Sequence, residues 1–172
     1  MARDEDFALV VGGSFMPNAC TPSIAEERSF RGVVIAAPSR VEFGEDTYDP
    51  KWGSFAPLVV CGAYKLEANY LGLLGKLRPH LSIAAIDTTR HLAYATTVPG
   101  VRNPMPPKPP LRPPEILTDA DFVGRVLTHY WNPNLAEILP IPAQEADYLI
   151  YAAFGAFVSN VVRMEVRQKG QP

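Results

Sequence analysis

The sequence predicts an all-β fold, an antiparallel β-sandwich of about seven to eight strands with a long proline-rich connection and one or two short helical turns. Three observations support this prediction. Apolar residues alternate with small or polar ones over several short runs, turn residues separate these runs, and the segment 147–166 has the pattern of two strands joined at Gly155-Ala156. A glycine in the first loop position is typical of a type II′ hairpin turn.

The N-terminal half contains three predicted strands. Residues 7–13 are expected to form a first strand, and residues 30–37 a second one, because of their Val/Ile run. Residues 40–43 are expected to extend the second strand beyond Pro38. Residues 57–67 alternate in the same way and predict a central strand, whereas residues 68–78 have only weak helical character because two glycines interrupt them.

Residues 81–87 and 92–98 predict a hairpin that turns across Thr88-Thr89-Arg90. In the second arm, Leu92, Tyr94, Thr96 and Val98 share one face. The other face carries His91, Ala93, Ala95 and Thr97, which are mostly small and uncharged. A face of small side chains can approach another surface closely, although it can equally be a solvated face.

Between Pro99 and Pro114, eight of sixteen residues are proline, which predicts an extended polyproline II strap over residues 99–117. Residues 118–172 supply only about three strands, the minimum for independent stability. We therefore expect a single domain over residues 1–172, in which the strap crosses the surface and returns the last strands to the first sheet.

The C-terminal part starts with a predicted strand over residues 119–131. Asn134 is a candidate N-cap for a short helical turn over residues 135–139, which Pro140 and Pro142 end. In the hairpin that follows, residues 148–154 are apolar on both faces, as in a strand that is covered on both sides. The second arm, residues 158–166, is apolar mainly on one face.

The strand number, the short turns and Tyr148 at the start of the penultimate strand resemble an immunoglobulin-like or fibronectin-type β-sandwich, mainly over residues 143–166. The resemblance implies that Tyr148 forms a tyrosine corner, in which its hydroxyl bonds to upstream backbone. The chain differs from antibody-type domains at Ile150, where a cysteine would stand. A jelly roll is the alternative strand order.

Composition excludes several classes of function. There are 16 basic and 18 acidic residues, so nothing indicates nucleic-acid binding, and no run is long enough to predict a membrane span. The N-terminus lacks a signal-peptide pattern, which indicates a cytoplasmic protein or a mature exported fragment. Cys20 and Cys61 are too few to define a disulfide framework, and we expect free, packed thiols unless the fold brings them together.

No catalytic or metal motif occurs, and no cofactor is expected. His80 and His91 can flank the 80–98 hairpin and hold a metal together with a carboxylate such as Asp87, but solvated histidines are the simpler interpretation. The carboxylates within residues 45–49 and 119–121 do not follow a calcium-loop pattern. Cys61 with His80 or His129 would be a candidate catalytic dyad, but the apolar surroundings of Cys61 disfavour a reactive thiolate.

Two kinds of binding residue remain. Exposed aromatics can stack on carbohydrate, and the candidates are Tyr48, Trp52 and Trp131. The candidate partner-binding residues are Leu149 and Tyr151 on the doubly apolar strand, and Pro107, Pro110 and Arg112 in the strap, which fit the spacing that SH3 grooves bind.

Only 20% of the residues are charged, against 47% apolar, which is low for a monomer that must stay soluble. This balance favours a non-enzymatic β-sandwich that acts through protein–protein contacts or self-assembly, as a structural or accessory subunit of a larger assembly. The alternatives are a carbohydrate-binding or small-ligand-binding module and a small hydrolase.

Overall fold

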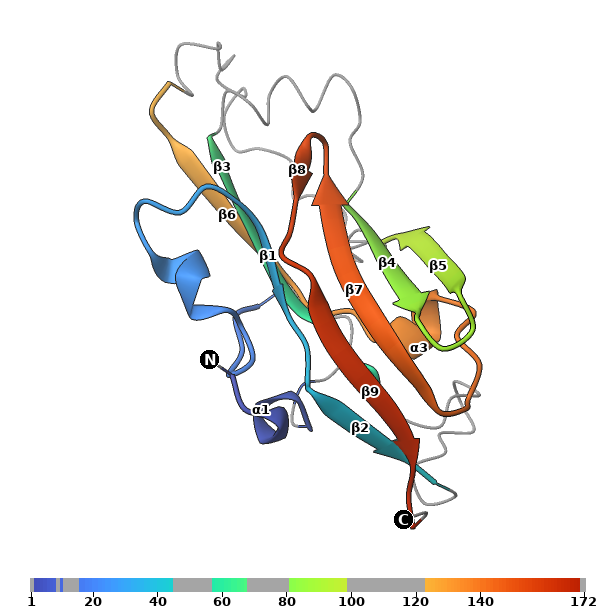
Figure 1. Cartoon of the computed structure of the whole chain (residues 1–172). Coiled ribbons are helices and arrows are strands. Elements are labelled where there is room, and N and C mark those ends of the chain that lie inside the picture. Colours follow the sequence, from blue (N-terminus) through green and yellow to red (C-terminus); the bar gives the residue numbers. More distant parts are fainter. Residues whose placement is uncertain are drawn as a thin grey trace, which may run out of the picture.

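The computed structural model describes residues 2–8, 10, 16–44, 57–67, 81–98 and 123–170, which form two β-sheets with short helical turns (Figure 1). The strands are β1 (Gly32–Ala36), β2 (Arg40–Phe43), β3 (Cys61–Glu67), β4 (Leu81–Asp87), β5 (Leu92–Thr97), β6 (Val126–Trp131), β7 (Ala146–Phe154), β8 (Phe157–Val158) and β9 (Val162–Gln168). The helical elements are α1 (Asp4–Ala8), the 3₁₀ turn η1 (Ser23–Glu26) and α3 (Leu135–Ile138). The predicted all-β class with short helical turns is confirmed.

The smaller sheet has the order β1-β3-β6 and the larger one the order β2-β9-β7-β4-β5, with β8 paired to β7. Neighbouring strands are antiparallel except for β2 and β9, which are parallel. Both sheets combine strands from before and after residues 99–122. The single domain over residues 1–172 stays a prediction, and the predicted strap lies outside the described residues.

The two sheets face each other across one apolar core. Alternate residues of β7 point into it, and Tyr148, Ile150 and Ala152 are at most 1% exposed. The smaller sheet contributes Val33, Ile35, Leu66 and Trp131 to the same cluster. Alternation with a period of two therefore places the apolar face of each strand inside, as a sandwich requires.

Residues 30–37 and 40–43 do not form one extended strand. β1 pairs with β3 in the smaller sheet, whereas β2 pairs with β9 in the larger sheet. Pro38, which has no backbone N–H, lies at the change of sheet, and the N–H of Glu165 donates to the Ser39 carbonyl at 2.9 Å. The chain therefore changes sheet at Pro38, which has no N–H to donate to the β1–β3 ladder.

The N-terminal segment differs from the prediction in two ways. Phe7 and Ala8 belong to helix α1 and not to a strand, and residues 9 and 11–13 lie outside the described part. Cys20 and Cys61 form a disulfide, so the expectation of free thiols is wrong. Phe7 packs with both cysteines on the outer side of β3, since the segment folds back over the smaller sheet and brings the two thiols together.

Asn134 caps α3 as predicted. Its side-chain oxygen accepts hydrogen bonds from Ala136 N–H at 3.2 Å and from Leu58 N–H at 2.9 Å. The carbonyl of Pro133 accepts a further bond from Val60 N–H at 3.1 Å. The cap therefore also ties α3 to the chain that leads into β3, a long-range contact that the sequence does not reveal.

The predicted hairpin at Gly155 is present, with a φ of 60° at that glycine. Its second arm is not one continuous strand but breaks between β8 and β9, where the Ser159 hydroxyl accepts the Ala152 N–H at 2.9 Å. The first arm, β7, was also expected to be covered on both sides. Within the described part of the chain its outer side is partly open, because Leu149 is 37% exposed.

Candidate protein-contact surface

The outward side of the larger sheet is divided into an uncharged half and a charged half. Strands β4, β5, β7 and β8 make the uncharged half, which we call the β4–β5–β7 face. It consists of outward side chains that are small or apolar: Ser82, Ala84, Ile86, Ala93, Ala95, Thr97, Leu149, Tyr151, Ala153 and Val158. None of them carries a charge.

The strand register arranges these side chains in rows. Ile86 lies between Ala93 and Leu149, and Ala84 lies in the next row between Ala95 and Tyr151. The first row combines Leu149 with Ile86 and Ala93, and the second combines Tyr151 with two alanines. The larger side chains therefore lie on β7 and at Ile86 of β4, whereas the outward side chains of β5 are small.

Strands β2 and β9, together with Asp147 at the start of β7, form the charged half. Arg167 pairs with Asp147 at 2.6 Å, and Arg163 contacts Asp147 and Glu165, each at 3.3 Å. Arg40 and Glu42 add a further ion pair at 2.9 Å. Three arginines face three carboxylates in this half, so its formal charge is balanced.

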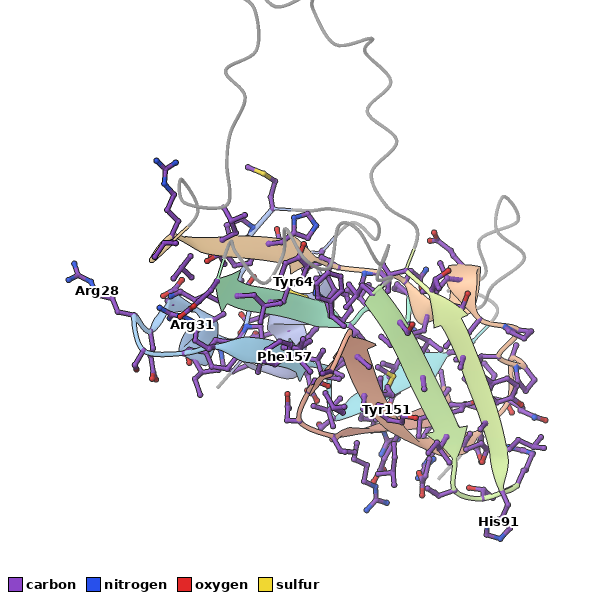
Figure 2. All side chains as sticks on the ribbon, turned by 90° about the horizontal axis from the view of Figure 1, so that it is seen from above. Arg28, Arg31, Tyr64, His91, Tyr151 and Phe157 are labelled. Atoms are coloured by element: carbon purple, nitrogen blue, oxygen red, sulfur yellow. A yellow bond between two sulfur atoms is a disulfide. The ribbon has the colours of Figure 1, made fainter. Side chains whose placement is uncertain are left out.

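The β4–β5 hairpin that carries much of the face is held rigidly at its tip. Asp87 is fully buried and accepts hydrogen bonds from the backbone of Thr89 (2.9 Å) and Arg90 (3.0 Å), and from the Arg90 guanidinium (2.9 Å). The N–H of Thr88 donates to the Asp147 carbonyl at 2.8 Å, which joins the tip to β7. Figure 2 shows β4, β5 and β7 side by side, with His91 at the hairpin tip.

Asp87 should make the free energy of unfolding depend on pH in the acid range. Burial raises the pKa of this carboxyl, but the hydrogen bonds from Arg90 and Thr89 outweigh burial and lower the pKa below its usual value. A lowered folded pKa contributes stability above the unfolded value of about 3.9, and this stability is lost as the pH falls through the folded value. We expect Asp87→Asn to lower the free energy of unfolding at pH 7 by roughly 1.5–3 kcal/mol. The variant should also show a smaller fall in the free energy of unfolding as the pH is lowered, measured by urea unfolding between about pH 7 and pH 2.

Asp4→Asn is the control for this prediction. The pKa of Asp4 is also lowered, mainly by a side-chain hydrogen bond from Ser39, but Asp4 is exposed. Its replacement should change the acid dependence less than Asp87→Asn does. An unchanged pH dependence in the Asp87 variant would contradict the assigned role of this turn.

The structure separates the predicted binding residues. Leu149 and Tyr151 both lie on the β4–β5–β7 face. Trp131 does not form an exposed stacking platform, because it is fully buried in the core above Gly62. The sequence could not reveal this, since aromatic residues suit both a core and a ligand site. The other predicted binding residues lie outside the described part of the chain: Tyr48, Trp52, Pro107, Pro110 and Arg112.

The candidate metal and thiol sites gain no support. In the described ranges, no group of three or more His, Cys, Asp or Glu side chains is placed to hold a metal ion. His91 is exposed at the hairpin tip, and His80 lies outside those ranges. Cys61 is bonded to Cys20 and cannot act as a thiolate in this state. Burial lowers the pKa of His129, whose ring lies tilted beside that of Tyr64 with the ring centroids 5.2 Å apart.

The tyrosine-corner bond expected at Tyr148 is not formed within the described residues, where the buried hydroxyl has no hydrogen-bond partner. Burial raises the pKa of Tyr148 to about 12, and the negative charge of Asp87 adds to the shift. Tyr148 therefore stays protonated and acts as a core side chain.

A hollow of about 440 Å³ lies between the N-terminal segment, β1 and the start of β9. Three of its polar lining residues are already engaged: Asn160 with Ile35, Ser39 with Asp4, and Arg163 with carboxylates. Such groups are not available to orient a ligand, so the β4–β5–β7 face is the stronger candidate.

The chain matches no protein-family model, no curated protein and no solved structure, so the surface is interpreted from its own residues. Within the described residues, no helix has both the length and the apolar character that crossing a membrane requires.

Proposed function

We propose that this protein is a non-enzymatic structural subunit that self-assembles through the β4–β5–β7 face. The single observation that carries the proposal is the division of the outward sheet surface into an uncharged half of small and apolar side chains and a balanced charged half. Core regions of protein interfaces are depleted of charge in the same way.

The partner that this surface suits is a second copy of the chain. The charged half beside the face has equal numbers of arginines and carboxylates, among them Arg163 and Asp147, so two copies meet without net repulsion. A strongly charged partner, such as nucleic acid, would require charges of a single sign there. The most common contact between identical chains is two-fold symmetric and uses the same patch on both.

We also propose an immunoglobulin-like architecture for the subunit. The order β1-β3-β6 corresponds to strands A, B and E of such a domain, and the order β9-β7-β4-β5 corresponds to G, F, C and C′ of the variable type. The strand order supports this architecture, while Ile150 departs from it, as does the Tyr148 hydroxyl, which has no hydrogen-bond partner among the described residues. A fold of this kind serves many functions, so the functional proposal depends on the surface.

Sedimentation velocity over an approximately hundredfold concentration range tests the proposal. We expect the average sedimentation coefficient to rise with concentration, and Leu149→Glu to weaken association by at least about tenfold, because association would have to remove the added carboxylate from water. Glutamate is the suitable replacement because Leu149 lies opposite Arg163, so the free subunit gains a cross-strand ion pair and stays folded.

Ile24→Glu is the matched control. Ile24 is 42% exposed, close to the 37% of Leu149, but it lies on η1 beside the smaller sheet. This variant should associate like the unmodified protein. A monomer at every concentration would remove the proposal, as would equal effects of the two substitutions.

A further inference from the structure

Strand β5 forms an open edge of the larger sheet. Within the described residues it pairs with β4 on one side, and no strand lies on its other side (Figure 1). The N–H of Val98 donates to the Leu81 carbonyl at 2.7 Å, which sets the alternation of the ladder. Backbone groups of even-numbered residues therefore point toward β4, and those of Ala93, Ala95 and Thr97 point outward.

Within the described part of the chain, β5 also lacks the features that normally protect an edge. Its sequence, LAYATT, contains no charged residue and no proline, and it stays in register with β4 along its whole length. Natural proteins usually block edge strands with charges, proline, bulges or a covering segment, because a free edge recruits other strands. An unprotected edge of six residues is therefore an unusual feature.

Two other edges of this sandwich are protected. On β1, the side-chain amide of Asn160 accepts the Ile35 N–H at 2.9 Å and donates to the Ile35 carbonyl at 3.0 Å, which are the two bonds that an added strand would make. On β2, the charged side chains of Arg40 and Glu42 lie at the edge of the larger sheet. Unlike β1 and β2, β5 has neither kind of protection among the described residues and can accept a partner strand.

We propose that β5 pairs antiparallel with β5 of a second copy, about a two-fold axis at Ala95, so that the two larger sheets become continuous. This register places Ala95 opposite Ala95, Ala93 opposite Thr97, and Tyr94 opposite Thr96 of the second copy. The outward N–H and carbonyl of Ala95 then exchange both hydrogen bonds with their counterparts. No charged side chains oppose each other along the strand, so the sequence is compatible with itself.

Edge pairing also enlarges the surface through which the proposed self-assembly takes place. A two-fold axis perpendicular to the sheet keeps the outward sides of both copies on the same side. The two β4–β5–β7 faces then lie next to each other as one surface. The choice of a second copy as the partner rests on the proposed self-assembly. The contact itself uses the backbone edge of β5 and is separate from the contact through the β4–β5–β7 face.

Ala95→Pro tests the edge contact. The Ala95 N–H points away from β4, so proline removes a bond to the second copy without removing one to β4, and proline is tolerated at edge strands. Thr96→Val is the control on the same strand, since its backbone bonds to β4 and its side chain lies on the inner side of the sheet with Ile83. In sedimentation velocity we expect Ala95→Pro and Leu149→Glu each to leave dimers, the double variant to be a monomer, and Thr96→Val to behave as the unmodified protein.

Hydrogen exchange gives a second measurement that needs no variant. The amides of Ala93, Ala95 and Thr97 should exchange rapidly in dilute protein and slow by about tenfold once roughly nine-tenths of it has associated, because only the monomer exchanges. This result decides the question even if Ala95→Pro fails to fold.

The outcomes separate the two proposals. If association persists unchanged in Ala95→Pro and is lost in Leu149→Glu, the edge contact is wrong and the face contact stands. If the three amides exchange equally fast at all concentrations while the protein associates, the edge contact is also wrong. A monomer throughout would overturn both.

Discussion

Trp131→Ala is expected to lower the free energy of unfolding by about 3–5 kcal/mol. Trp131 is fully buried on β6 and belongs to the core between the two sheets. Alanine would leave a cavity against Gly62 that the rigid sheet backbone cannot fill. Urea unfolding followed by circular dichroism measures the change, and a loss below about 1 kcal/mol would contradict the central place of this side chain.

Gly62 gives the matched test of the same contact. A Cβ at position 62 would overlap the indole ring of Trp131, so Gly62→Ala should destabilise the protein by roughly 1–3 kcal/mol, although alanine normally suits a strand better than glycine. In a Trp131→Ala background the overlap is absent and the penalty should disappear. Additive losses in this double-mutant cycle would show that the two residues do not pack together.

Removing the disulfide is expected to have the second large effect. The bond joins Cys20 to Cys61 across 41 residues of sequence, and closing a loop of that length stabilises a protein by about 4 kcal/mol in the chain-entropy model. Both sulfur-bearing residues are fully buried, and Phe7 packs beside them. The paired variant Cys20→Ala/Cys61→Ala should therefore lose about 2–4 kcal/mol in urea unfolding.

Reductant provides the control. The unmodified protein should lose a similar stability in dithiothreitol, whereas the paired alanine variant should be insensitive to it. Equal stability of the unmodified protein with and without reductant would contradict the bond. Thiol titration of the unfolded chain, which should detect no free thiol before reduction, is an independent check.

Local features of the fold could be predicted from the sequence because their causes are local. The cap at Asn134 and the turn at Gly155 each depend on a few neighbouring residues, and both are present. The hairpin formed by β4 and β5 was also predicted closely, since its alternation and its turn lie within 17 consecutive residues, 81–97. The break between β8 and β9 was missed, because the Ser159 hydroxyl and not the apolar pattern decides it.

The candidate surface could be predicted only in part. Leu149 and Tyr151 stood out as apolar residues on the second face of a strand, and Ala93 and Ala95 stood out as small outward residues. Their meeting on one face depends on the register of β7 and β5 against β4, which no short stretch of sequence specifies. Trp131 was assigned to a ligand site for the same reason, since only its position between the sheets identifies it as a core residue.

By itself, the sequence determined the β class, most of the strands and the alternation that gives each strand an inner and an outer face. These properties follow from side-chain chemistry within a few residues. Only the tertiary structure decided that Cys20 meets Cys61, that β1 and β2 belong to different sheets, and that among the described strands β5 is left with an open edge while Asn160 closes β1. Each of these depends on contacts between segments far apart in the chain, where local preferences carry no information.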